Sequence, residues 1–261
     1  MKLKKILNVN FFAIATIILL QSCVSKKEIL YMQDLDSYSP TELSYNNSEI
    51  QIDDVLKITV STLIPEAAIP YNKSFDELGQ QNQNIDIMIL DGYLVSQDKT
   101  INFPVLGTIS VDGKTTNVLE KALKERLESG GHLIDPIVTI RLLNAKVTIL
   151  GEVSSPGTYK FTENNMSFLQ ALGLAGDLTI NGNREDIIII RSIDGIQTTS
   201  HLNLTSADWL NGPYQNIRTN DVIVVNPNSA MVKSAGFIGN ASVVLAMASI
   251  ILSSIVILTN L

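Results

Sequence analysis

The chain has 261 residues, enough for one large domain or for two or three small ones. Acidic side chains outnumber basic ones, 26 against 19, so the formal net charge is −7. This acidic balance argues against non-specific binding to DNA or RNA. The single cysteine excludes an intramolecular disulfide.

The N-terminus has the pattern of a secretion signal. Three lysines lie within the first five residues, and the apolar stretch 11–20 that follows is too short to span a bilayer comfortably. The sequence Leu-Gln-Ser before Cys23 resembles the lipobox of bacterial lipoproteins, which has a small residue before the acceptor cysteine. That resemblance implies a signal peptide over residues 1–22 and lipidation of Cys23, where several acyl chains would anchor the protein stably. The alternative is a stray leader cysteine.

The next part of the chain is predicted to be a polar tether, residues 23–48, followed by a small domain rich in short strands. The clearest helix there is 117–128, with Asn117 and Glu120 placed for a capping box and a leucine stripe for burial. The adjacent acids Asp53 and Asp54 are interpreted as a turn rather than as metal ligands. Strands are expected at 49–60, 85–90, 93–96, 100–103, 108–111 and 137–142.

A second small domain is predicted around a strand at 147–150 and a helix at 167–176. Ser167 is the expected N-cap and Gly176 the expected end of this helix. Asp194-Gly195 predicts a tight hairpin turn, because both residue types tolerate positive φ. Further elements are expected at 185–191, 196–199, 206–210 and 221–225.

The C-terminus is predicted to be a transmembrane helix within residues 234–261. No ionisable side chain follows Lys233, and the apolar stretch 241–258 has about the length needed to cross a bilayer. Small and polar residues share one face at helical spacing, which suits helix packing or the lining of a pore. A single tail anchor is the alternative. The residues of this stripe are Ala235, Gly239, Ser242, Ala246, Ser249, Ser253 and Asn260.

No catalytic, cofactor-binding or metal-binding motif is recognisable. The two histidines, His132 and His201, are isolated from each other and from a second ligand at metal-binding spacing. Phosphate-binding, dinucleotide-binding and nucleophile-elbow patterns are absent from the sequence. The prediction is therefore a protein without catalysis, metal or cofactor. A cell-envelope hydrolase that uses two carboxylates stays open as an alternative, because sequence does not give the distance between carboxylates.

Two segments of the first domain carry motifs in which an expected glycine is replaced. Gln51-Ile-Asp-Asp-Val-Leu-Lys-Ile58 has the form x-x-G-D-V-L-x-I, with Asp53 at the glycine position. The segment 98–111 has the form D-G-x-I-x-x-P-x-x-G-x-I-x-V, with Lys99 at the glycine position.

The second domain adds Val147-Thr-Ile-Leu-Gly-Glu-Val-Ser-Ser-Pro-Gly157, then Arg191, then Asn220-Asp-Val222. Taken together, these motifs resemble the outer-membrane polysaccharide export lipoproteins, the Wza-like family with an export domain and a soluble-ligand-binding β-grasp (SLBB) domain. The resemblance spans about residues 49–226. It implies an α+β fold with a small β-rich export domain, a β-grasp-like SLBB domain and the C-terminal helix. The implied domains are 1–22, 23–48, 49–144, 145–228 and 234–261.

The resemblance also implies a function, a location and partners. The protein would be one subunit of a homo-oligomeric ring in the bacterial outer membrane, lipid-anchored, with its domains in the periplasm. Capsular polysaccharide or exopolysaccharide would pass through the ring, delivered by an inner-membrane co-polymerase with a tyrosine-kinase-like partner. The alternative is a monomeric glycan-binding envelope lipoprotein with a tail anchor.

Overall fold

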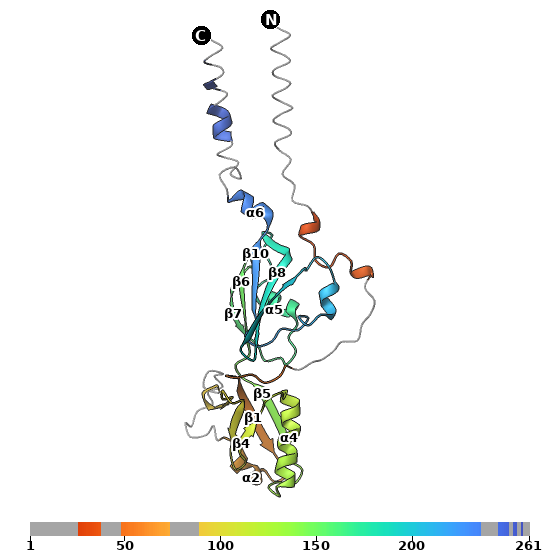
Figure 1. Cartoon of the computed structure of the whole chain (residues 1–261), viewed down its shortest axis with the longest axis vertical. Coiled ribbons are helices and arrows are strands. Elements are labelled where there is room, and N and C mark those ends of the chain that lie inside the picture. The colour runs from red at the N-terminus through yellow and green to blue at the C-terminus, as the bar shows by residue number, and fades with distance from the viewer. Residues whose placement is uncertain are drawn as a thin grey trace.

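The computed structural model describes residues 26–37, 48–73 and 89–235, with short stretches at 245–250, 253–254 and 257. Two hydrophobic cores divide these residues, one formed between Ile50 and Ile140 and the other between Val147 and Val225. Figure 1 shows the two domains stacked end to end, with β1, β5 and α4 in one and β6, β8 and β10 in the other. The fold is α+β, as the sequence predicts.

The first domain is built on a three-stranded antiparallel sheet in the order β2–β1–β5. These strands are β1 (Val55–Ser61), β2 (Tyr93–Leu94) and β5 (Ile137–Leu142). Alternation along β1 sends Leu56, Ile58 and Val60 into the core, because successive side chains of a strand point to opposite faces. β3 (Thr100–Phe103) and β4 (Gly107–Ser110) form a separate hairpin that contributes Ile101, Phe103 and Ile109.

Helix α4 (Thr116–Ser129) covers the first core through Leu119, Leu123 and Leu127, the leucines of the predicted stripe. Its N-cap differs from the prediction: the Thr115 side chain, not Asn117, accepts the hydrogen bond from the backbone N–H of Val118. Glu120 is therefore free for another role, and its Oε1 accepts the backbone N–H of Ile140 on β5 at 2.7 Å. The remaining helical turns of this domain are α2 (Pro65–Ala68) and η3 (Ile69–Tyr71).

The expected strand at 85–90 is not confirmed. Residues 85–88 lie outside the described residues, and Ile89 and Leu90 are helical. The expected strand at 49–60 begins later, at Val55. Residues before it form a turn in which Asp53 has φ 66°, so the predicted turn at Asp53 is confirmed and it delays the start of the strand.

The second domain is a five-stranded mixed sheet in the order β7–β6–β10–β8–β9. β6 and β10 pair in parallel at its centre, and the other pairs are antiparallel. The Asp194-Gly195 hairpin between β8 and β9 is confirmed, with φ of 52° and 76°. The strands are β6 (Lys146–Gly151), β7 (Gly157–Lys160), β8 (Gly182–Ile193), β9 (Ile196–Leu202) and β10 (Val222–Pro227).

Helix α5 (Phe168–Leu174) packs on this sheet, which gives the β-grasp-like arrangement. Its N-terminus is a full capping box, in which Ser167 and Gln170 each bond the other's backbone N–H, and Gly176 follows it at φ 72°. Both predicted ends of this helix are thus confirmed. Trp209 in η4 (Asp208–Asn211) contacts Phe168 edge to face at 5.6 Å.

Part of the predicted tether is docked on the second domain. The backbone N–H groups of Met32 and Gln33 donate to the carbonyls of Leu204 and Thr205, at 2.9 and 2.8 Å. The Tyr31 hydroxyl donates to Asp177 at 2.6 Å. We call residues 29–37 the strap. It is held by side-chain and backbone contacts that a polar composition alone does not reveal.

The predicted C-terminal transmembrane helix is not supported. Among the described residues, no helix is long and apolar enough to cross a membrane, which takes about 20 consecutive helical residues. The helical residues after β10 are α6 (Ser229–Ser234) and the short stretches 245–250, 253–254 and 257. The rest of the predicted span lies outside the part of the chain that the structure describes.

Candidate functional site at the domain junction

The two domains are joined by three residues, Leu143 to Ala145, and this connection is hydrogen-bonded on both sides. The Asn144 side chain accepts the backbone N–H of Val55 at 2.9 Å and donates to the carbonyl of Asp53 at 2.8 Å. The carbonyl of Ala145 accepts from Phe161 in the second domain at 3.1 Å. The connection is thus fastened to the first domain at Asn144 and to the second at Ala145, which leaves few free backbone torsions between the domains.

A second contact between the domains lies at the β8–β9 hairpin. Lys99 Nζ forms ion pairs with Asp112 at 2.8 Å and with Asp194 at 2.5 Å. The backbone N–H of Asp194 also donates to the Gln51 side chain at 3.2 Å. Lys99 donates hydrogen bonds to these two carboxylates, and they raise its pKa, with the bond to Asp112 making the larger contribution. The lysine that replaces a motif glycine thus reaches across to the other domain.

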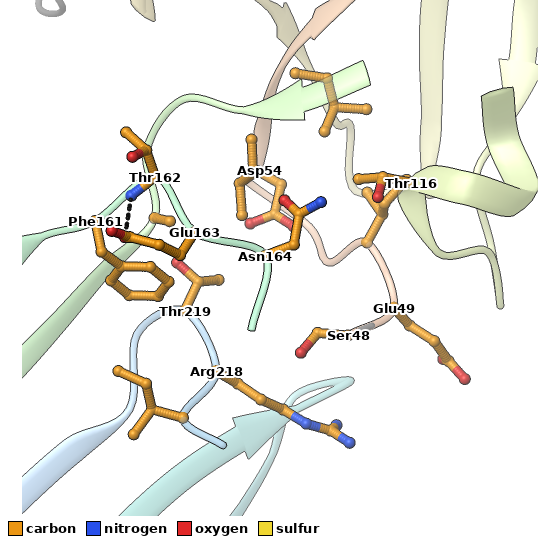
Figure 2. A pocket seen from close by; sticks show the side chains of 15 residues that line it. Ser48, Glu49, Asp54, Thr116, Phe161, Thr162, Glu163, Asn164, Arg218 and Thr219 are labelled. Atoms are coloured by element: carbon orange, nitrogen blue, oxygen red, sulfur yellow. Dashed lines mark hydrogen bonds between the residues drawn. The ribbon is translucent and has the colours of Figure 1, made fainter. Parts of the chain in front are cut away.

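A small pocket of ≈ 60 Å³ lies at the junction and is lined by residues of both domains. Figure 2 shows its walls: Asp54 from the turn before β1, Glu163 and Asn164 from the loop after β7, and Arg218 and Thr219 from the loop before β10. The remaining walls include Ile50, Leu142 and Ile217. A volume of this size has room for a few water molecules.

Asp54 is the most unusual group in this pocket. It is only 2 % exposed, and its Oδ2 accepts the backbone N–H of Gln51 at 2.8 Å. Its Oδ1 has no hydrogen-bond partner among the described residues. Burial is the main cause that raises the pKa of Asp54 to about 6, because it disfavours the charged form. The neighbouring charge of Asp53 adds to this effect.

The arrangement offers no catalytic constellation. Asp54 faces no second buried carboxylate in this pocket, because the other two lining carboxylates, Glu49 and Glu163, are exposed, and the remaining lining groups are hydroxyl, amide, guanidinium, aromatic and aliphatic side chains. Within residues 26–37, 48–73 and 89–235, no three His, Cys, Asp or Glu side chains gather as a metal site would need. The junction is therefore suited to fixing domain geometry rather than to bond making.

The motif residues of the second domain form a buried ion pair. Arg191 donates to both carboxylate oxygens of Asp221, at 2.9 and 2.6 Å, and the two side chains are 5 % and 1 % exposed. Arg191 also donates to the carbonyls of Pro213 and Asn216 at 3.1 Å each. The ring of Tyr214 lies 4.8 Å from the guanidinium carbon. These contacts fasten the loop 213–216 to the centre of the sheet.

The predicted site residues are only partly described. Cys23, Gly239, Ser242 and Asn260 lie outside the described residues. The other members of the stripe, Ala235, Ala246, Ser249 and Ser253, are exposed, and the Ser249 hydroxyl donates to the carbonyl of Ala246 at 2.7 Å. Lipidation of Cys23 and the packing role of the stripe stay predictions.

Sequence reasoning missed the junction. The Asp53-Asp54 pair was interpreted only as a turn, and nothing local marks Asp54 as buried, since its burial depends on residues more than 100 positions later. Lys99 and Asp194 likewise meet across 95 positions. One signal was available: the two replaced glycines, Asp53 and Lys99, which both adopt positive φ and both contribute to the junction.

Two domain families match the chain in series. The polysaccharide biosynthesis/export protein family matches residues 44–143, and the SLBB domain matches residues 146–197. The two matches meet at the three-residue connection between the domains. The chain therefore carries a polysaccharide biosynthesis/export domain followed by an SLBB domain, and the resemblance stated from its sequence is confirmed at that level.

The names of curated relatives also refer to polysaccharide export. The chain is 33 % identical over 106 residues to the EPS I polysaccharide export outer membrane protein EpsA of Ralstonia nicotianae, which covers 39 % of this chain and 27 % of that protein. It is 25 % identical over 193 residues to the capsule polysaccharide export protein BexD of Haemophilus influenzae, covering 73 % and 46 %. The chain thus spans between about a quarter and a half of the length of the curated relatives it matches.

Proposed function

We propose that this protein is a subunit of an oligomeric outer-membrane conduit that exports capsular polysaccharide or exopolysaccharide, as a passive component without catalysis. The observation that carries the proposal is the export domain followed directly by an SLBB domain, matched in series over residues 44–197. The names of the relatives support outer-membrane export. The hydrogen-bonded junction supports a structural role, because a ring of two-domain subunits needs a fixed angle between the domains.

The position of the strap on the second domain supports a defined orientation of the protein relative to the membrane. We expect Cys23 to be lipidated, and Met32 lies nine residues beyond it on the second domain. Nine residues reach at most about 30 Å when fully extended, and the 3-10 helix Lys26–Glu28 shortens that reach. The second domain would then lie next to the outer membrane and the first domain would extend into the periplasm, toward an inner-membrane co-polymerase with a tyrosine-kinase-like partner.

Export is tested by deletion and complementation in the native bacterium. Deletion should abolish surface polysaccharide while polymer accumulates inside the envelope, and the full chain should restore export. A Cys23→Ser variant should lose the lipid mass and much of the export, with its expression level as the control. Unchanged surface polysaccharide in the deletion strain would contradict the proposal.

Assembly is tested separately by light scattering and electron microscopy of the full chain in mild detergent. A closed ring is the expected result. A monomer at every concentration, also after co-expression with the co-polymerase, would contradict the conduit and favour a glycan-binding lipoprotein.

A further inference from the structure

Asp54 is linked through one residue to the contact at the β8–β9 hairpin. Its Oδ2 accepts the backbone N–H of Gln51 at 2.8 Å. The Gln51 side chain in turn accepts the backbone N–H of Asp194, on the second domain, at 3.2 Å. Gln51 therefore joins the buried carboxyl group of the first domain to the second domain.

A second link runs through the chain neighbours of Asp54. The Asn144 side chain, in the connection between the domains, accepts the backbone N–H of Val55 and donates to the carbonyl of Asp53. Asp54 lies between these two residues, so a shift of its backbone moves both groups that Asn144 bonds. Its own carbonyl accepts the backbone N–H of Val95 at 2.9 Å. The turn that carries Asp54 is thus part of both contacts between the domains.

No counter-charge neutralises the buried carboxyl group of Asp54 among the described residues. Its Oδ1 has no hydrogen-bond partner there. Figure 2 shows the Arg218 guanidinium, across the pocket, turned away from it. The two other acids that line the pocket, Glu49 and Glu163, are exposed, and Asp53 next in the chain adds a like charge.

The protonation state of Asp54 determines what the closed junction costs. A neutral carboxyl group is tolerated among the apolar walls Ile50, Leu142 and Ile217, whereas a carboxylate there is a buried charge without a partner. Opening of the pocket lets water solvate the carboxylate, but it also strains the hydrogen bonds that join the domains. Burial raises the pKa of Asp54 to about 6, so the neutral form persists in mildly acidic solution.

We propose that ionisation of Asp54 loosens the junction, so that the angle between the domains is fixed in acid and less restricted at neutral pH. The inference goes beyond the export function and does not depend on it, because it concerns the junction alone. In the open junction a solvated Asp54 has its ordinary pKa of 3.8. The ratio of closed to open junctions therefore falls as pH rises from about 4 to about 6, by up to about a hundredfold.

The test uses spin labels at Lys121 and Thr199 of the full chain, in a Cys23→Ser background and diluted with unlabelled chain. The distribution of distances between the two labels should be broader at about pH 7.5 than at about pH 4.5. The same comparison with Asn144→Ala should show the larger change, because weakening the connection populates the open junction. Cooperative unfolding of each variant at both pH values verifies that it is folded.

Asp54→Asn removes the titrating group and keeps an acceptor for the backbone N–H of Gln51. Its distance distribution should be the same at both pH values, also when combined with Asn144→Ala. His201→Gln is the matched control, because His201 is exposed two residues from one label and a histidine ordinarily changes charge in this range. The pH dependence should persist in this variant.

Three results would overturn the proposal. These are equal distributions at both pH values in Asn144→Ala, a pH effect of the same size in Asp54→Asn, or a pH effect that disappears in His201→Gln. Failure of the export function is distinguishable from each of them, because it is measured by deletion in cells and leaves the distance measurement intact.

Discussion

At the scale of single residues, Asp54 is the group from which a pH dependence follows. Its folded pKa of about 6 exceeds its ordinary value of 3.8 because burial disfavours the carboxylate. Between these values the folded state holds a proton that the unfolded state has released. Stability therefore falls as pH rises from about 4 to about 6 and stays level above that. Ionisation of Asp54 in the folded state lowers the free energy of unfolding by on the order of 3 kcal/mol.

Asp54→Asn should remove this dependence. The amide oxygen still accepts the backbone N–H of Gln51, and no charge is buried, so the free energy of unfolding at pH 7 should rise by about 1–3 kcal/mol. Denaturant unfolding at several pH values between 4 and 8 measures both the pH dependence and the rise at pH 7. The exposed Asp208→Asn serves as the control and should change little. A variant whose stability still falls between pH 4 and 6 by the wild-type amount would show that another group is responsible.

At two further residues the chain departs from the family motifs. Asp53 and Lys99 occupy positions where the motifs have glycine, and both have positive φ, at 66° and 51°. Glycine adopts that conformation without steric cost, which is the physical reason for the motif. The Lys99 side chain bonds Asp112 and Asp194, whereas Asp53 contacts Asn144 only through its backbone carbonyl, which a glycine would also supply.

At the scale of elements, the Arg191–Asp221 pair holds the central strands β8 and β10 together with the loop 213–216. Asp221→Asn should cost about 3–5 kcal/mol of unfolding free energy, because it leaves a buried guanidinium without its counter-charge. Thermal or denaturant unfolding of the full chain measures the loss.

The chain contains a matched control for this change. Asp186 pairs with His201 at 2.5 Å on the surface, where the side chains are 44 % and 60 % exposed. Asp186→Asn should cost less than about 1 kcal/mol, because exposed ion pairs contribute little. Equal losses from the two variants would mean that burial does not set the strength of the inner pair.

At the scale of the whole molecule, we expect the angle between the domains to depend on Asn144, which fixes the connection to the first domain. Its side chain satisfies the backbone of Val55 and of Asp53 from within the connection. Asn144→Ala should cost about 1–3 kcal/mol and widen the range of domain orientations, because the N–H at the start of β1 loses its partner. Spin labels at Lys121 and Thr199, in a Cys23→Ser background, report this as a broader distance distribution between the domains.

Asn164→Ala is the control for that measurement, since Asn164 lines the junction pocket without standing in the connection. This variant should leave the distribution of distances between the two spin labels narrow. A narrow distribution in Asn144→Ala as well would show that the contacts of Asp194 with Lys99 and Gln51 are sufficient to fix the angle. Loss of export in a variant with loosened domains would then connect the junction to the conduit.

The sequence by itself determined the local structure and the family. Capping at Ser167, the Asp194-Gly195 turn and the strand boundaries at 100–103 and 137–142 follow from interactions within a few residues, which is why they were predicted correctly. Only the tertiary structure decided which polar groups are buried and what they meet. The pocket that Asp54 lines, the strap on Leu204 and the buried Arg191–Asp221 pair all depend on contacts between distant segments. The C-terminal stretch shows the limit of predicting from apolar length, because it predicted a membrane helix that the described residues do not support.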